Sequence, residues 1–139
     1  MMTLNLETVI FCFFAAGIGG AIGAFVRFFM TEAAKKYTSF PAGVLISNIV
    51  GTFLLALVSF YILKETMFSG EISEQLERAV FFFNTGILGS LTTFSAFSYD
   101  NLIYLEDKKY FKAAANIFSN ILISAAAVFV AYGFIFNIL

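Results

Sequence analysis

The chain has 139 residues, of which 60% are hydrophobic and only 12% are charged, and its formal net charge is −1. Soluble domains carry about 25% charged residues, so this composition excludes a water-soluble globule and makes a lipid bilayer the expected solvent. Histidine is absent and Cys12 is the only cysteine, which excludes an intrachain disulfide and a zinc site built on these residue types, and the charge gives no reason to expect nucleic acid as a partner.

Four apolar stretches are long enough to cross a bilayer, which takes about 20 helical residues. They cover residues 9–30, 41–63, 79–99 and 113–138, and the charged residues fall almost entirely between them. The sequence therefore predicts an all-α membrane protein, a single domain over residues 1–139 with four transmembrane helices. Four helices alone enclose little space, so any pathway is expected to need an oligomer. The first stretch is not expected to be a cleaved signal, because no Lys or Arg lies in residues 1–8.

The first stretch contains small residues at intervals of four, among them Gly19, Gly20 and Gly23. Such spacing lets two helices approach closely, so these glycines are predicted to pack against another helix. Arg27 follows near the end of the stretch, where a charge inside a membrane is costly and is usually functional or extended toward the interface. Two interpretations remain open for Arg27: an interfacial anchor, or a vestibule cation that attracts anions.

The second stretch carries a polar amide, Asn48, in the middle of a mostly apolar helix. In hydrocarbon this group has to find a hydrogen-bond partner. It is therefore either part of an interhelical hydrogen bond or a donor that lines a pore and contacts an anion. The segment alone does not decide between the two.

The third stretch is the most informative, because glycines and several hydroxyl side chains lie in its middle. Gly89, Ser90, Thr92 and Thr93 together predict a break in the helix at membrane depth. An irregular backbone at that depth is tolerated only where it is buried in protein or lines a cavity, and freed carbonyl groups there can hold a cation. The alternative is a kink in which Ser and Thr side chains satisfy the backbone.

Phe94 and Phe97 follow the predicted break at a spacing of three, which places them on one helix face. The edge of an aromatic ring is positive, so two ring edges can contact an anion without the tight binding of a fixed Lys, which would hinder release. The chain has 20 Phe residues, so this spacing alone does not distinguish an anion contact from packing.

Asn116, Asn120 and Ser124 form a polar stripe on the fourth stretch at intervals of four. Such a stripe either joins helices by hydrogen bonds or lines a water-accessible track. No catalytic set accompanies it, because every Asp and Glu is assigned to a loop, a tail or the end of a span, and no nucleophile has a histidine base. The chain is therefore predicted not to be an enzyme.

Taken together, these segments resemble the Fluc/CrcB fluoride channel family over nearly the whole chain. The first two stretches match family patterns at Gly19, Gly20, Gly23, Ala24 and Arg27, and at Gly43, Leu45, Asn48 and Gly51. The third-span signature, Gly-Gly-x-Thr-Thr-Phe-Ser-Thr-Phe, is the most specific, and it matches Gly89, Thr92, Thr93, Phe94, Ser95 and Phe97. The chain departs from the family patterns at Val44, Ser90 and Ala96, where the family has Thr, Gly and Thr.

The resemblance implies a fluoride-selective anion channel subunit in the cell membrane, which mediates passive fluoride efflux and lowers cytoplasmic fluoride toxicity. It implies an antiparallel, dual-topology dimer with two pores along the subunit interface and a structural sodium ion at the dimer centre. Gly89 and Thr92 are the best matches for the backbone carbonyls that hold the sodium ion. The implied fluoride pathway combines ring edges with polar side chains from three spans: Asn48, Phe94, Ser95, Phe97, Asn116, Asn120 and Ser124.

The distribution of basic residues bears on the kind of dimer. The first and third loops carry five basic residues, or six with Arg27, whereas the second loop carries two. The positive-inside rule then places the first and third loops in the cytoplasm, but an antiparallel homodimer needs one sequence to insert both ways with nearly balanced loops. A homodimer and a heterodimer with a paired homologous subunit therefore both remain open.

Two other functions compete with the channel. An assembly or accessory membrane subunit, held together by its glycine faces, is the non-transporting alternative, and it predicts that Phe94 and Phe97 only pack. A small multidrug antiporter is disfavoured, because its chemistry needs a carboxylate inside the membrane and the sequence assigns none to the spans.

Overall fold

The computed structural model of the chain describes residues 6–38, 40–70 and 73–137. Three crossings of the bundle are single helices, and one is made of several segments. The single helices are α1 (Leu6–Lys35), α2 (Ala42–Ser69) and α6 (Tyr110–Asn137), and the composite crossing comprises α3 (Glu74–Val80), the π-helix η1 (Phe81–Leu88), α4 (Gly89–Leu91) and α5 (Phe94–Glu106). All four crossings are long and apolar enough to span a membrane, which confirms the predicted number.

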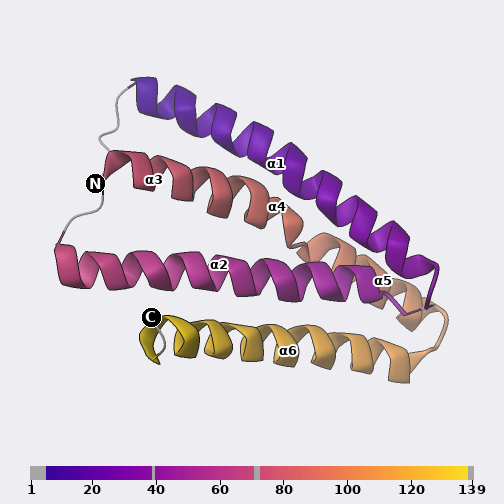
Figure 1. Cartoon of the computed structure of the whole chain (residues 1–139). Coiled ribbons are helices and arrows are strands. Elements are labelled where there is room, and N and C mark those ends of the chain that lie inside the picture. The colour runs from indigo at the N-terminus through magenta and orange to yellow at the C-terminus, as the bar shows by residue number, and fades with distance from the viewer. Residues whose placement is uncertain (1–5, 39, 71–72, 138–139) are drawn as a thin grey trace.

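The four crossings lie side by side and alternate in direction, so α1 begins and α6 ends at the same end of the bundle (Figure 1). α2 packs against α6, and α1 packs against η1, α4 and α2. The composite crossing therefore contacts α1 in its first half, and its second half, α5, contacts α6. This change of neighbour coincides with the gap in the ribbon between α4 and α5 (Figure 1).

A narrow stripe of α1 is buried in the subunit, and it includes Gly19 and Gly23. A Cβ atom on Gly19 would lie 2.9 Å from the Cα atom of Gly86, and one on Gly23 would overlap the carbonyl of Ile87, so both glycines let α1 touch the composite crossing. Gly20 faces elsewhere, because no described atom outside its adjacent residues and the nearby backbone of α1 lies within 4 Å of the place its Cβ would occupy. The three glycines thus belong to two faces of α1, one inside the subunit and one turned away from it.

The composite crossing is longer and less regular than the predicted span 79–99. Its helical segments begin at Glu74 and end at Glu106, and residues 81–88 form a π-helix that the sequence did not indicate. Between α4 and α5 the helix is interrupted, because Thr92 and Thr93 are extended, with ψ angles of 145° and 119°. This interruption agrees with the break predicted from the glycine and hydroxyl residues.

The prediction that residues 100–112 form a loop is wrong for their first part. α5 continues to Glu106 because its inner face stays buried at Asn101 and Tyr104. Asp100 consequently lies within the third crossing, and its buried Oδ2 atom has no hydrogen-bond partner among the described residues. The statement that every acidic side chain falls in a loop, a tail or the very end of a span is corrected accordingly.

Candidate functional site

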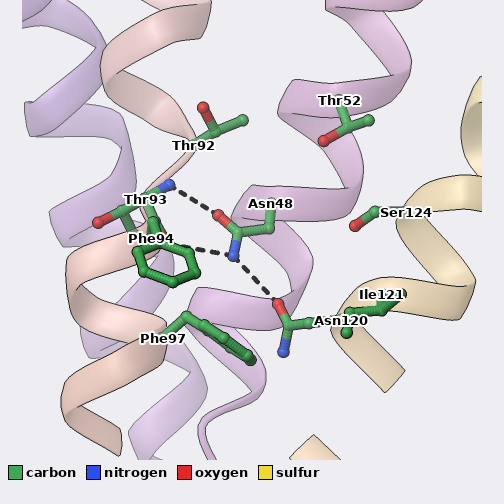
Figure 2. A pocket seen from close by; sticks show the side chains of 9 residues that line it. All are labelled: Asn48, Thr52, Thr92, Thr93, Phe94, Phe97, Asn120, Ile121 and Ser124. Atoms are coloured by element: carbon green, nitrogen blue, oxygen red, sulfur yellow. Dashed lines mark hydrogen bonds between the residues drawn. The ribbon is translucent and has the colours of Figure 1, made fainter. Parts of the chain in front are cut away.

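The break in the composite crossing is held by the side chain of Asn48 from α2. The Thr93 backbone N–H donates to Asn48 Oδ1 at 2.8 Å, and Asn48 Nδ2 donates to the Thr93 carbonyl at 3.3 Å (Figure 2). The amide of Asn48 therefore pairs with both backbone groups of one extended residue, as a neighbouring strand would. The Thr93 hydroxyl caps the next helix, because it accepts a hydrogen bond from the Ala96 N–H at 3.3 Å.

The hydrogen bonds of the Thr93 and Ala96 N–H groups to side chains leave two backbone carbonyls without their helical donors. In a continuous helix, the N–H groups of Thr93 and Ala96 would donate to the carbonyls four residues earlier, those of Gly89 and Thr92. Here they donate to side chains, so within the described residues the Gly89 carbonyl keeps only a long 3.5 Å contact from the Thr92 hydroxyl. Freed carbonyl oxygens are hard donors suited to an alkali cation, and these two are the ones predicted as sodium ligands.

The residues around the break fit a cation held by backbone oxygen rather than by acidic side chains. No cluster of three or more His, Cys, Asp or Glu side chains that could hold a metal ion occurs in the part of the chain that the structure describes. Gly89 is exposed on the surface of the subunit, so its carbonyl lies where a second subunit could approach. The donor set of Gly89 and Thr92 is incomplete within one chain, because two carbonyls are fewer ligands than a hard cation takes.

A crevice of about 350 Å³ adjoins the break, between α2, α5 and α6. Its lining combines amides, hydroxyls and aromatic rings, and it contains no charged side chain among the described residues that form it: Asn48, Thr52, Thr92, Thr93, Phe94, Phe97, Asn120, Ile121 and Ser124. Figure 2 shows the two Phe rings on the α5 side and Asn120 and Ser124 on the α6 side, with Asn48 between them. The crevice is thus a polar, uncharged groove with an aromatic wall.

The two aromatic rings differ in exposure. Phe94 is 79% exposed, whereas Phe97 is half-buried, and their ring centroids lie 5.7 Å apart with an interplanar angle of 45°. The rings are therefore neighbours but not stacked. The large exposed area of Phe94 indicates that its environment is completed by something outside the single chain, either lipid or another subunit.

The polar stripe on α6 divides into residues that line the crevice and a residue that lies behind it. Asn120 and Ser124 line the crevice, and Asn48 Nδ2 donates to Asn120 Oδ1 at 3.0 Å. Asn116 is fully buried behind them and accepts two hydrogen bonds from Asn120 Nδ2, at its side-chain oxygen and at its backbone carbonyl, both at 3.0 Å. The structure thus brings Asn48, Asn116 and Asn120 together, with Asn116 outside the crevice lining.

Ser95 and Arg27 lie on the other side of the break. They line a second crevice of about 700 Å³ together with Tyr99 and, at its rim, an exposed ion pair in which Lys35 Nζ lies 2.6 Å from a Glu32 carboxylate oxygen. Arg27 forms no ion pair within the described ranges, so none of the described acidic side chains neutralises its charge. The backbone at Thr93 and its hydroxyl, which lies 3.1 Å from the Ser95 hydroxyl, separate the two crevices.

Sequence reasoning missed two residues of this site. Thr52 lines the crevice and lies four residues after Asn48, so helical spacing on α2 was a usable signal. Asn101, on α5, is buried and accepts a hydrogen bond from Asn116 Nδ2 at 3.2 Å. It was assigned to a loop, and it became visible as part of the site only once α5 was seen to continue past residue 100.

The chain as a whole is similar to known proteins. The family described as "CrcB-like protein, Camphor Resistance (CrcB)" matches residues 14–133. A fluoride-specific ion channel FluC of Thermococcus onnurineus (strain NA1) is 38% identical over 118 residues, which cover 85% of this chain and 90% of that protein. FluC 3 of Methanosarcina acetivorans is 36% identical over 116 residues, covering 84% and 94%. FluC of Alteromonas mediterranea is 40% identical over 114 residues, covering 81% and 83%.

The pairing of Asn48 with Thr93 predicts the effect of a nearly isosteric substitution. Asn48→Leu leaves both backbone groups of Thr93 without partners, which costs roughly 1–3 kcal/mol. Amide hydrogen exchange at Thr93, measured in detergent micelles, is expected to accelerate about tenfold or more.

Asn84→Leu is the matched control for this measurement. Asn84 also bridges two crossings, since its Nδ2 donates to the Ser59 hydroxyl of α2 at 3.3 Å, but it lies away from the break. Equal exchange at Thr93 in wild type and Asn48→Leu, or equal acceleration in both variants, would show that Asn48 does not hold the extended segment.

Proposed function

Because this chain belongs to the family of CrcB-like proteins, it is a fluoride channel subunit rather than an enzyme, and we propose that fluoride crosses it along the 350 Å³ crevice beside the helix break. The protein is a multi-pass membrane protein that mediates passive fluoride efflux and so lowers cytoplasmic fluoride toxicity. The observation that carries the proposed route is the lining of this crevice, in which amide and hydroxyl groups face two phenylalanine rings.

An uncharged lining suits a small hard anion. Such an ion sheds its hydration shell only where other donors replace the water, and a fixed positive charge would hold it too tightly to let it leave. Asn48 and Ser124 provide N–H and O–H donors on one wall, where Asn120 Oδ1 accepts from Asn48, and the positive ring edges of Phe94 and Phe97 provide the other wall. Conduction then requires contacts that are favourable enough for entry and weak enough for exit.

The hydrogen bonds of Asn48 make its contact with fluoride an exchange. Its Nδ2 atom already donates to the Thr93 carbonyl at 3.3 Å and to Asn120 Oδ1 at 3.0 Å. An anion at Asn48 therefore accepts an N–H hydrogen bond that a protein oxygen accepted before, and the oxygen accepts it again when the ion moves on. The net gain of such an exchange is small, which keeps the ion mobile.

We propose that the subunit works as an antiparallel dimer of dual topology. Phe94 is 79% exposed in the single chain, and the small-residue face of α1 at Gly20 has open space beside it, so two surfaces are available to a partner. In this arrangement Arg27, in the second crevice, provides a vestibule charge that raises the local concentration of anions. The partner is a second copy of the chain or a paired homologous subunit. The uneven distribution of basic residues among the loops supports the paired homologous subunit.

The accessory-subunit alternative is not favoured, because the similar proteins are named as channels themselves. Purified protein reconstituted alone in liposomes is therefore expected to release trapped fluoride, with chloride as the comparison ion. Fluoride efflux well above the chloride rate eliminates an obligatory second gene product. Efflux only after co-reconstitution with a homologous subunit would instead establish the heterodimer, and no efflux in either case would reject the channel function.

The aromatic wall is tested by removing its rings. Phe94→Ile and Phe97→Ile keep apolar bulk but lose the positive ring edge, so each is expected to reduce fluoride efflux from liposomes at least tenfold while the oligomer stays intact. Phe129→Ile is the control, because Phe129 is also highly exposed, at 76%, but lies outside the crevice lining. Efflux at the wild-type rate in both crevice variants would reject the aromatic route and favour a packing role.

We further propose that the freed carbonyls of Gly89 and Thr92 hold a structural sodium ion at the dimer centre. Each subunit supplies two oxygens, and an antiparallel dimer doubles the set around the symmetry axis. The bound cation would replace the helical N–H donors that these carbonyls have lost.

Sodium binding to the folded dimer is expected to stabilise it by mass action. The thermal midpoint of the purified protein should therefore rise when sodium chloride replaces N-methylglucamine chloride at constant ionic strength. Identical midpoints in the two salts, together with an undiminished fluoride efflux in sodium-free liposomes, would argue against the ion.

A further inference from the structure

Asn101 is a buried amide on α5 that lies one helical turn beyond Phe97. Its side chain is 6% exposed, and it lies outside the lining of the crevice. Its Nδ2 atom donates to the backbone carbonyl of Phe97 at 2.8 Å, and its Oδ1 atom accepts from Asn116 Nδ2 at 3.2 Å. Asn101 therefore connects the polar stripe of α6 back to the helix that carries the aromatic rings.

With Asn101 included, four asparagines form a continuous chain of hydrogen bonds in which each amide nitrogen donates to the next oxygen. We call this chain the amide relay. It runs from α2 through α6 to α5, with donor–acceptor distances of 3.0, 3.0, 3.2 and 2.8 Å along Asn48, Asn120, Asn116, Asn101 and the Phe97 carbonyl. Every amide in it points the same way.

The direction of the amide relay is fixed by the backbone at both ends. At one end, the N–H of Thr93 can only donate, and it donates to Asn48 Oδ1 at 2.8 Å. At the other end, the carbonyl of Phe97 can only accept, and it receives the Asn101 donor. An amide that turned over alone would place nitrogen against nitrogen or oxygen against oxygen in a buried site, which is costly. The two ends therefore specify the orientation of all four side chains.

Both ends of the amide relay lie at the start of α5, one at its N-cap residue Thr93 and one at Phe97. The first turn of α5 follows Thr93 and carries Phe94 and Phe97. The relay therefore links this turn to α2 and α6 by hydrogen bonds at Thr93 and Phe97. Loss of the Asn101 link would release the Phe97 end and would let Asn116 turn over. The disturbance would then pass along the relay to Asn120 and Asn48.

We propose that Asn101 is a positioning residue of the fluoride pathway, which holds the amide relay in its single orientation and thereby keeps the Asn48 amide, which lines the crevice, with its Nδ2 donor directed at Asn120 Oδ1. The inference rests on the proposed route of fluoride along that crevice. Fluoride does not touch Asn101; the residue acts through Asn116. After an ion has accepted a hydrogen bond from the relay and then moved on, the fixed ends return each amide to the same orientation.

Two substitutions of one shape separate this role from mere packing. In Asn101→Thr, a hydroxyl can donate to the carbonyl four residues earlier, as helical Thr does, and can accept from Asn116. Asn101→Val has the same shape without either group. In liposome efflux assays, Asn101→Thr is expected to keep at least half of the wild-type fluoride rate and Asn101→Val to lose about tenfold. Asn84→Leu, which removes an interhelical amide outside the relay, is the control and is expected to stay within twofold of wild type.

A second readout follows the relay itself. The side-chain amide resonances of Asn48, which is three relay bonds away, are expected to shift in Asn101→Val and to remain near their wild-type positions in Asn101→Thr. If Asn101→Val does not yield folded protein, the smaller pair Asn101→Ser and Asn101→Ala differs by the same hydroxyl and replaces it in both measurements.

The outcomes distinguish this inference from the proposed function. Equal fluoride rates for Asn101→Thr and Asn101→Val in a conducting wild-type background would overturn the positioning role and leave the channel assignment standing. A wild-type protein that does not conduct would reject the proposed route. Unmoved Asn48 resonances in Asn101→Val would then also overturn the relay, since that readout does not depend on conduction.

Discussion

The pairing of the Asn48 side chain with the backbone of Thr93 is the interaction on which the rest of this structure depends. At membrane depth no water is available for an unpaired N–H or carbonyl group, so a break in a transmembrane helix survives only if protein groups replace the lost bonds. Asn48 does so with two hydrogen bonds, and the Thr93 hydroxyl starts the next helix. The extended pair Thr92–Thr93 is therefore stable, whereas the same segment without these partners would form continuous helix.

The site follows from that break. Because the N–H groups of Thr93 and Ala96 donate to side chains, the carbonyls of Gly89 and Thr92 lack their helical N–H donors. Because α5 starts anew after the break, Phe94 and Phe97 occupy its first turn and face the amides of α2 and α6 (Figure 2). One set of hydrogen bonds thus accounts for a candidate cation site and for a crevice that suits an anion.

The amide relay explains how a lining without charge can still have a defined polarity. A hydroxyl or a neutral amide can turn to present either a donor or an acceptor, and an acceptor facing the crevice would repel an anion. Backbone groups of fixed polarity at Thr93 and Phe97 remove that freedom from all four asparagines. The Asn48 donor is therefore oriented before the ion arrives, and no lysine or arginine is needed in the crevice itself.

The sequence by itself determined the membrane class, the four spans and the family, and it predicted the break near Thr92 and Thr93 with a kink as the alternative, because these depend on composition, local helix chemistry and a specific motif. It identified Asn48, Phe94, Phe97, Asn120 and Ser124 as candidates, but it left open whether Asn48 pairs with protein or faces a pore. Only the tertiary structure decided that Asn48 pairs with the protein backbone while lining the crevice. It also decided that Ser95 lies across the break and that Asn116 is buried behind Asn120. It also brought in Asn101, which local hydropathy had assigned to a loop. Those assignments depend on which side chains meet across crossings that are far apart in sequence, and no local pattern along a single helix records that meeting.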